Sequence, residues 1–308
     1  MANISTIKNL IDCGGNSVLG SGTKGCRPFL AKVQTLWLLP SGFTFDPDRE
    51  LDEEYVRELQ VAGNLVVVSG IRAFTDESQD NTTEELEDGT QSVTRLGLYQ
   101  FQANFINGLY FNTFLNSISG FSNYDIMFID RLGSILGTES LSGSLKGFTT
   151  GMIQAQKLVW STDTTVGREG LQWQFLDRSE LDRDYLLIQG AQLDFNPNRI
   201  DGINEVRLDG TVPVSGASTV VVKATTRQDG KNFTGAVLSN FLVTKNGVTV
   251  TPSSVAEVNG VYTFTLPVPA LATNDVVEVQ LYNSVVNKNV VTMDSTLFKS
   301  NLSRVVTV

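Results

Sequence analysis

Residues 99–105 alternate strictly between apolar and amide side chains, and this alternation constrains the fold more than any other stretch of the chain. The apolar members are Tyr99, Phe101, Ala103 and Phe105, and the amides between them are Gln100, Gln102 and Asn104. Because successive side chains of a strand point to opposite faces, the pattern predicts a β-strand with one buried and one wet face. Other stretches suited to strands lie at 29–39, 65–74, 124–129, 134–138, 151–160 and 171–175.

Helical patterns are fewer than strand patterns. One helix is predicted to begin at the Asp46-Pro47-Asp48 segment, because acids favour a helix N-terminus, and to end at Gly63. Its apolar face consists of Leu51, Tyr55 and Leu59, which recur at four-residue spacing. A second, short helix is predicted over 109–118. Strands with one or two helices against them indicate a mainly β core, either a β-sandwich or a barrel-forming sheet.

The composition changes near Asn204, after which Val and Thr dominate and Trp and Cys are absent. Strand candidates follow at 204–209, 218–225, 239–244, 248–251, 255–258, 261–265 and 275–282. Asn246-Gly247 and Asn259-Gly260 suit tight hairpin turns, in which both central residues need positive φ. This spacing predicts an immunoglobulin-like β-sandwich. The expected organisation is a glycine-rich N-terminal arm over 1–27, a core over 28–203, and the immunoglobulin-like domain with a C-terminal tail over 204–308.

Acidic residues are concentrated in one window of the chain. Positions 44–90 hold fourteen Asp or Glu and three Arg, a balance of −11, whereas the whole chain carries −10. Solvation and the helix dipole explain the acids up to Glu58. A long polar loop over 75–90, between two strands of a hairpin, has no folding reason for its charge, and long loops of this kind are commonly functional. Its acids are Asp76, Glu77, Asp80, Glu84, Glu85, Glu87 and Asp88.

The chain contains no histidine. The commonest general base and metal ligand are therefore missing, and a Ser-His-Asp triad is impossible. The only cysteines, Cys13 and Cys26, provide too few ligands for structural zinc. Two idle thiols are favoured over a disulfide, because the N-terminal residues lack a secretory signal and indicate synthesis in a cytoplasm. We expect no catalytic residues, no metal, no cofactor and no enzymatic activity.

Binding to membranes or nucleic acid is also disfavoured. No run of 18 apolar residues is present, which predicts no membrane span. The pI near 4.6 argues against a partner held by its phosphates, because such binding needs clustered Lys and Arg.

The order of elements resembles that of the major tail tube proteins of tailed bacteriophages. The matching stretches are the long hairpin of residues 65–74 and 91–105, the second half over 124–160, and an appended immunoglobulin-like module over about 205–294. The core resemblance covers residues 28–195. It implies a virion protein, assembled in the host cytoplasm, whose copies form rings of six that stack into a tube. DNA would pass through the bore without specific binding, and the partners would be further copies and other virion proteins.

Within that resemblance the acidic loop has two possible roles. Carboxylates could line the bore and keep the duplex from binding. They could instead meet basic patches on the neighbouring ring, which the long hairpin of the family commonly contacts. The strand carrying Tyr99, Phe101 and Phe105 would contribute to the oligomeric barrel, since closure of strands from several subunits removes sheet edges.

Three other functions are compatible with the sequence. The chain could be another virion component, such as a capsid decoration protein, a connector ring or a fibre-associated protein. Its C-terminal sandwich could bind carbohydrate or a cell surface. The aromatic candidates for that role are Phe233, Phe241, Tyr262 and Tyr282. An enzyme that uses paired carboxylates is the least favoured alternative.

Overall fold

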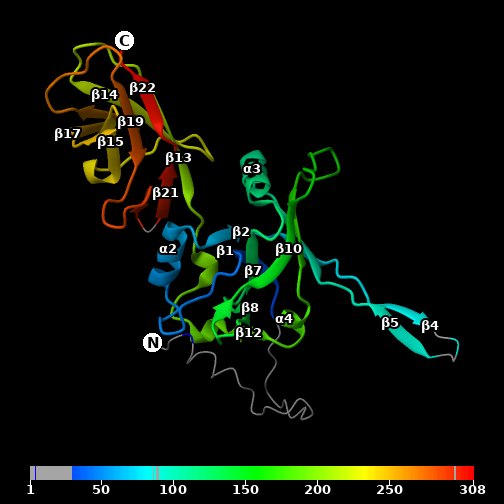
Figure 1. Ribbon diagram of the computed structural model, residues 1–308. Helices are drawn as coiled ribbons and strands as arrows, with labels where there is room; N and C mark the ends of the chain where they lie inside the picture. Colours follow the sequence, from blue (N-terminus) through cyan, green and yellow to red (C-terminus); the bar gives the residue numbers. More distant parts are fainter. Residues whose placement is uncertain (1–3, 5–29, 86, 88–89, 295) are drawn as a thin grey trace. The chain divides into compact units, whose positions relative to one another are not determined.

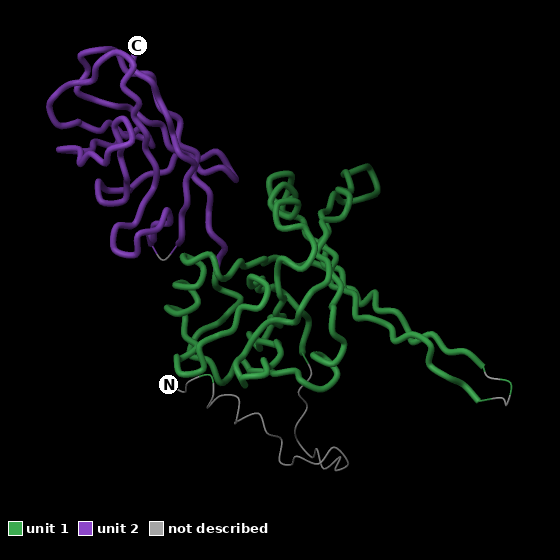
Figure 2. The backbone as a smooth tube through the Cα atoms, in the orientation of Figure 1, with its two compact units in different colours: residues 1–200 green, residues 201–308 purple. Residues whose placement is uncertain are grey.

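The structure is a computed structural model that describes residues 4, 30–85, 87, 90–294 and 296–308. Apart from Ile4, the predicted glycine-rich N-terminal segment over 1–27 lies outside the described residues, as do Cys13, Cys26 and Asp88. The chain divides into two compact units, residues 1–200 and 201–308, which Figure 2 distinguishes by colour. The division falls close to the change of composition near Asn204. Each unit has its own hydrophobic core, and the protein is mainly β.

Unit 1 is built on one ten-stranded sheet. Its strands are β1 (Val33–Pro40), β2 (Val66–Ser69), β3 (Ala73–Asp76), β6 (Gln100–Phe105), β7 (Tyr124–Asp130), β8 (Ile135–Glu139), β9 (Leu145–Lys146), β10 (Phe148–Ala155), β11 (Glu169–Phe175) and β12 (Tyr185–Ile188). The main order is β12-β8-β7-β10-β11-β6-β3; in addition β1 pairs with β2 and β7, and β9 with β8. All these pairings are antiparallel.

The central strand β1 is buried on both faces. Leu36 and Leu38 belong to a core cluster that includes Phe101 and Trp173, so β6 and β11 pack over this side. Trp37 and Leu39 point to the opposite side, where the helix α2 (Glu53–Ala62) closes a second cluster. Burial on both faces explains why the sequence of β1 is almost continuously apolar rather than alternating.

The helix α2 begins later than its sequence predicts. The segment from Asp46 is a turn, in which the Asp46 carboxylate accepts from the Asp48 amide, and the helix begins only at Glu53. Asp52 is the N-cap, because its Oδ1 accepts from the Tyr55 amide at 2.7 Å. The predicted end is confirmed: Gly63 has φ +81°, a left-handed conformation that glycine adopts at a helix C-terminus without steric cost.

Two further expectations for unit 1 are corrected. The stretch 65–74 is not one strand, because the chain turns at Gly70 (φ +86°) and passes from β2 to β3 in another part of the sheet. The loop over 75–90 contains a strand, β4 (Thr82–Glu85), which pairs with β5 (Gln91–Arg95) just after the loop to form a two-stranded ribbon. This ribbon, cyan in Figure 1, projects from the rest of unit 1. Neither of its faces is buried, so it has no apolar alternation that sequence analysis could detect.

The second half of unit 1 follows the predicted pattern with small additions. The helix α3 (Leu109–Ile118) has its predicted bounds, and the strands at 124–129, 134–138 and 171–175 are confirmed as β7, β8 and β11. The strand predicted over 151–160 is shifted, since β10 ends at Ala155. A one-turn helix α4 (Ser179–Asp182) and β12 were not predicted.

Unit 2 is the expected sandwich of two sheets. One has the order β17-β18-β14-β13-β21-β20 and the other β16-β15-β19-β22. The bounds are β13 (Asn204–Thr211), β14 (Thr219–Thr226), β15 (Phe241–Lys245), β16 (Val248–Val250), β17 (Ser254–Val258), β18 (Val261–Thr265), β19 (Val276–Leu281), β20 (Val290–Met293), β21 (Thr296–Ser300) and β22 (Ser303–Val306). All seven predicted strands are present. The residues after 294, expected to be a tail, instead supply β21 and β22, which complete both sheets.

Candidate assembly surfaces

The four strands β10, β11, β6 and β3 form a sheet segment whose two faces differ sharply. Phe101, Trp173 and Ile153 on one face are buried in the core of unit 1. The other face carries amides that align across the strands, with Gln154 opposite Gln172 and Gln172 opposite Gln102. Its remaining members are Thr75, Gln100, Asn104, Met152, Gln156 and Gln174. No charged side chain lies on this face within the four strands, and we call it the amide face.

The amide face makes hydrogen bonds within itself. The Nε2 of Gln156 donates to Oε1 of Gln172 at 2.5 Å, and the Nε2 of Gln102 donates to Oδ1 of Asn104 at 3.2 Å. Most of its side chains remain half-exposed. The surface is therefore polar, uncharged and held in register by the strands below it.

The strand β3 forms one edge of the sheet. It pairs with β6 and with no other strand of the described chain. Because the Glu77 amide donates to the Gln100 carbonyl, the alternation of an antiparallel ladder points the backbone N–H groups of Phe74 and Asp76 away from β6. Exposed backbone groups in a row are a template for pairing with another strand.

The two-stranded ribbon follows directly after this edge. We call residues 79–96 the arm; every described residue in it is exposed. The acids Glu84 and Glu85 lie on β4, Glu87 lies in the turn, Asp80 precedes β4, and Asp76 and Glu77 lie just before the arm at the end of β3. Asp76 accepts from the Ser78 amide, which shapes the exit from the sheet. The structure thus brings Asp80, Glu84, Glu85 and Glu87 to one projecting element, whereas Asp76 and Glu77 lie at its base, with Glu77 opposite Gln100 at the end of the amide face.

Arg178 anchors the base of the arm. Its guanidinium donates to Oδ1 of Asn81 at 2.7 Å and to the Gly97 carbonyl at 3.4 Å, and pairs with Asp182 at 2.7 Å. The Tyr99 hydroxyl also donates to Asp182, and this hydrogen bond raises the pKa of Tyr99 above its ordinary value. Gly97 allows the two sides of the arm to approach, because a Cβ there would lie 1.7 Å from the Gln79 carbonyl oxygen.

Replacing Arg178 with alanine is expected to loosen the arm without unfolding unit 1. The variant loses the hydrogen bonds that join both ends of the arm to α4, so backbone amides of residues 79–97 should exchange faster with deuterium, as followed by mass spectrometry. Arg183→Ala is the matched control, since this neighbouring arginine is exposed and its side chain forms no hydrogen bond or ion pair with the described residues of the arm. Equal exchange in the two variants would mean that Arg178 does not anchor the arm.

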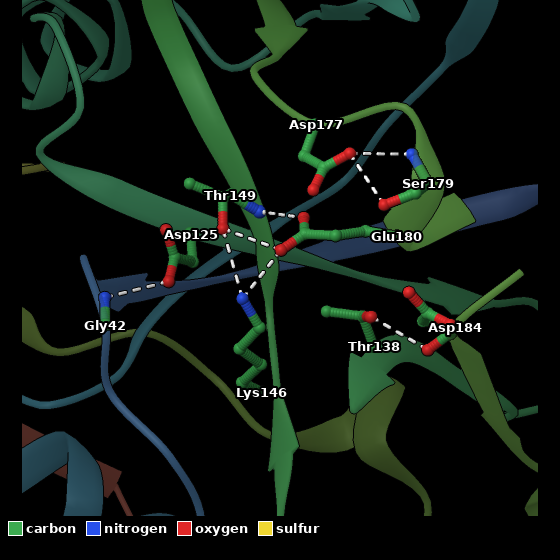
Figure 3. A network of polar contacts seen from close by, with 9 residues as sticks. All are labelled: Gly42, Asp125, Thr138, Lys146, Thr149, Asp177, Ser179, Glu180 and Asp184. Atoms are coloured by element: carbon green, nitrogen blue, oxygen red, sulfur yellow. Dashed lines mark hydrogen bonds and ion pairs between the residues drawn. The ribbon is translucent and has the colours of Figure 1, made fainter. Parts of the chain in front are cut away.

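A second polar cluster surrounds Glu180, two residues after Arg178 (Figure 3). The Glu180 carboxylate accepts from the Lys146 ammonium at 2.6 Å, the Thr149 amide at 2.6 Å and the Thr149 hydroxyl at 2.8 Å. Asp125, which is 1% exposed, lies nearby and accepts from the Gly42 amide at 2.9 Å through Oδ2, while its Oδ1 has no hydrogen-bond partner among the described residues. Burial raises the pKa of Asp125 to about 6. Sequence analysis missed this cluster, whose two carboxylates, Asp125 and Glu180, are 55 positions apart.

The contacts in this cluster indicate a structural role, because they connect α4 to the sheet. Both oxygens of Glu180 are occupied by Lys146 and Thr149, and the contacts join α4 to β9 and β10. Among the described residues, no group of three or more Cys, Asp or Glu side chains is placed to hold a metal ion.

The aromatic residues of the strand that we expect to contribute to an oligomeric barrel pack inside unit 1. Phe101 and Phe105 are 7% and 0% exposed, and Phe101 packs against Phe74, Phe128 and Trp173. Tyr99 is half-buried and stacks on Phe101. Their strand presents its amides, not its aromatics, to the outside, and its part in an oligomeric barrel stays a prediction. The alternation within 171–175 was the signal that could have revealed the matching amides of β11.

The surface aromatics expected on unit 2 are also largely internal. Phe233, Phe241 and Tyr262 are all buried in the sandwich core, Phe241 and Tyr262 from the strands β15 and β18 and Phe233 from the connection between β14 and β15. Only Tyr282 retains partial exposure. The carbohydrate-binding hypothesis therefore loses three of its four candidate contacts.

Comparison with known proteins adds no relative. A scan against models of known protein families finds no match, and a search of curated proteins finds no significantly similar sequence. Within the described part of the chain, no helix combines the length and the hydropathy needed to cross a membrane.

Proposed function

We propose that this chain is a structural subunit of rings that stack into the tail tube of a tailed bacteriophage. The observation that supports this best is the open edge of an amphipathic sheet: β3 has an unpaired outer side, and the sheet behind it already buries its apolar face. Such an edge is satisfied when a strand of a second copy pairs with it. Because β3 would meet a different part of the neighbour, the contact is head-to-tail, and it closes into a ring.

In this ring the amide face forms the wall of the bore. Strands from six copies, the number implied by the resemblance, would close into one barrel with no free edge. An uncharged wall neither captures phosphates nor adds a barrier of like charge along the path of DNA. Asp80, Glu84, Glu85 and Glu87 lie on the arm instead, with Asp76 and Glu77 at its base, which favours a stacking role for the arm acids over a role in the bore. Localisation in the virion and contacts with other virion proteins belong to the same proposal.

A proline placed on the edge strand tests this function. Asp76→Pro removes a backbone N–H that points away from β6, so it leaves the ladder inside the subunit intact while blocking the pairing with a neighbour. We expect electron microscopy of the purified wild type to show rings or tubes, and the variant to remain monomeric with an unfolding temperature close to that of the wild type.

Asp76→Ala is the matched control, because it removes the same carboxylate but keeps the amide, and it should still assemble. A wild type that stays monomeric at high concentration and under all solution conditions, as judged by sedimentation, would refute the proposed function. Assembly of Asp76→Pro would show that rings close through another edge.

A further inference from the structure

We propose that the loop between β10 and β11 is the docking surface for the arm of a second copy, so that subunits stack head to tail along the strand direction. This inference rests on the proposed function and names the partner surface of the arm. We call residues 156–168 the Trp160 loop. It leaves β10 after Ala155 and returns at β11, with Val159 and Arg168 joined by two backbone hydrogen bonds of 3.0 Å.

The Trp160 loop exposes apolar and basic side chains together. Trp160 is 67% and Val166 is 66% exposed, whereas Trp37 and Trp173, the other two tryptophans, are fully buried. Its charged residues are the two bases Lys157 and Arg168 and the acid Asp163, all exposed, and neither base forms an ion pair with another described residue. An exposed tryptophan flanked by basic groups is the composition of an energetically dominant contact in protein interfaces.

The arm has the complementary composition. It carries Asp80, Glu84, Glu85 and Glu87 against the single base Arg95, and these acids form no ion pair within the described chain. Val93 and Leu96 on the returning side are 52% and 59% exposed. A two-stranded ribbon alone in water is at best marginally stable. The arm therefore has both the charge and the apolar surface to gain from docking on the Trp160 loop.

The register of the strands shows at which end of the sheet the arm and the Trp160 loop each lie, and therefore how two copies must be arranged for these surfaces to contact. Gln174 of β11 lies opposite Gln100 of β6, and the arm begins at this end of the sheet. Glu169 lies opposite Phe105 at the other end, and there the Trp160 loop begins. The arm and the loop thus leave the same sheet at opposite ends, so the two surfaces meet between successive copies along the strands. A head-to-tail contact of this kind repeats without closing and produces a stack.

A further exposed apolar group lies at the loop end of the sheet. Ile106 follows β6 directly and is 51% exposed. Several large apolar side chains at one end of a sheet indicate an interaction surface rather than a solvated loop. An arm of this length, about 25 Å at the usual rise per strand residue, can reach across such a surface.

Charge reversal on each side tests the contact with full-length proteins. The loop variant Lys157→Glu/Arg168→Glu and the arm variant Glu84→Lys/Glu85→Lys should each form rings but no tubes, with stacking weakened at least about tenfold. A protein that carries all four substitutions should recover tubes, because the charges are complementary again. Arg131→Glu/Arg199→Glu is the matched control: it changes the net charge as the loop variant does, at exposed positions away from the Trp160 loop, and should still stack.

A complementation experiment separates this inference from ring formation. A donor with Lys157→Glu/Arg168→Glu/Trp160→Ala keeps a wild-type arm, and the arm variant serves as acceptor with an intact Trp160 loop. On mixing, the emission of the acceptor's Trp160 should shift to shorter wavelength, whereas neither protein alone should show the shift. The shift would support docking even if no rings form. Its absence from the mixture, or tubes formed by the loop variant, would overturn the inference.

Discussion

Glu180→Ala is expected to destabilise unit 1 by about 3 kcal/mol, because breaking a buried ion pair leaves its partner charge unsatisfied. Glu180 is 7% exposed, and its carboxylate holds the Lys146 ammonium at 2.6 Å together with the amide and hydroxyl of Thr149. Removing it leaves the Thr149 backbone N–H without its acceptor, and it leaves the Lys146 ammonium without a counter-charge and with only the Thr149 hydroxyl, 3.2 Å away, as a partner. For a unit of this size the unfolding temperature should fall by about 6–12 °C, measured by differential scanning calorimetry.

Two further variants give this prediction a control. Glu53→Ala removes an exposed ion pair with Arg57 on α2, and such a pair contributes about 0.5 kcal/mol or less. Adding Lys146→Met to Glu180→Ala removes the orphaned charge and should recover a large part of the loss. If Glu180→Ala costs no more than Glu53→Ala, the buried pair does not stabilise the joint between α4 and the sheet.

Asp125→Asn is expected to stabilise unit 1 at neutral pH and to change how its stability depends on pH. Burial raises the pKa of Asp125 to about 6 from the ordinary 3.8, and the Glu180 carboxylate acts in the same direction. The Gly42 amide, the Lys146 ammonium and the Ser41 side chain oppose the shift. The folded protein therefore binds this proton more tightly than the unfolded chain does.

The direction of the pH effect follows from that difference. Above about pH 6 the buried charge costs up to about 3 kcal/mol; the cost shrinks as the pH falls through 6 and vanishes below about pH 4. The asparagine variant has no such charge, so it should exceed the wild type in unfolding free energy by about 2 kcal/mol at pH 7.5 and approach it at pH 4. Urea unfolding at a series of pH values measures both.

The surface residue Glu54 provides the comparison for this titration. Glu54→Gln removes an exposed carboxylate from α2, and its stability relative to the wild type should vary little between pH 4 and pH 7.5. A constant difference between Asp125→Asn and the wild type across this range would show that Asp125 is not charged at a cost in the folded state.

Several elements of the fold could be predicted because their cause is local. The helix end at Gly63 needs a left-handed residue, and the strands of unit 2 are marked by alternation and by Asn-Gly turns whose positive φ values the structure contains. The fold class of both units follows from such patterns. The start of α2 could not be placed equally well, because Asp46 and Asp52 are both chemically suitable caps and only the packing of Tyr55 and Leu59 selects the second.

The candidate surfaces, like the elements of the fold, could be predicted only in part from the sequence. The sequence by itself determined that acid is concentrated before position 90, that one strand has an amide side, and that the usual catalytic imidazole is absent. Only the tertiary structure decided that amides of three strands share one face, that the aromatics of 101 and 105 turn inward, and that Glu180 meets Lys146. The reason is physical: alternation and charge are properties of neighbours along the chain. Which strands pair, which edge stays open and which ends carry the arm and the Trp160 loop depend on contacts between residues far apart in sequence.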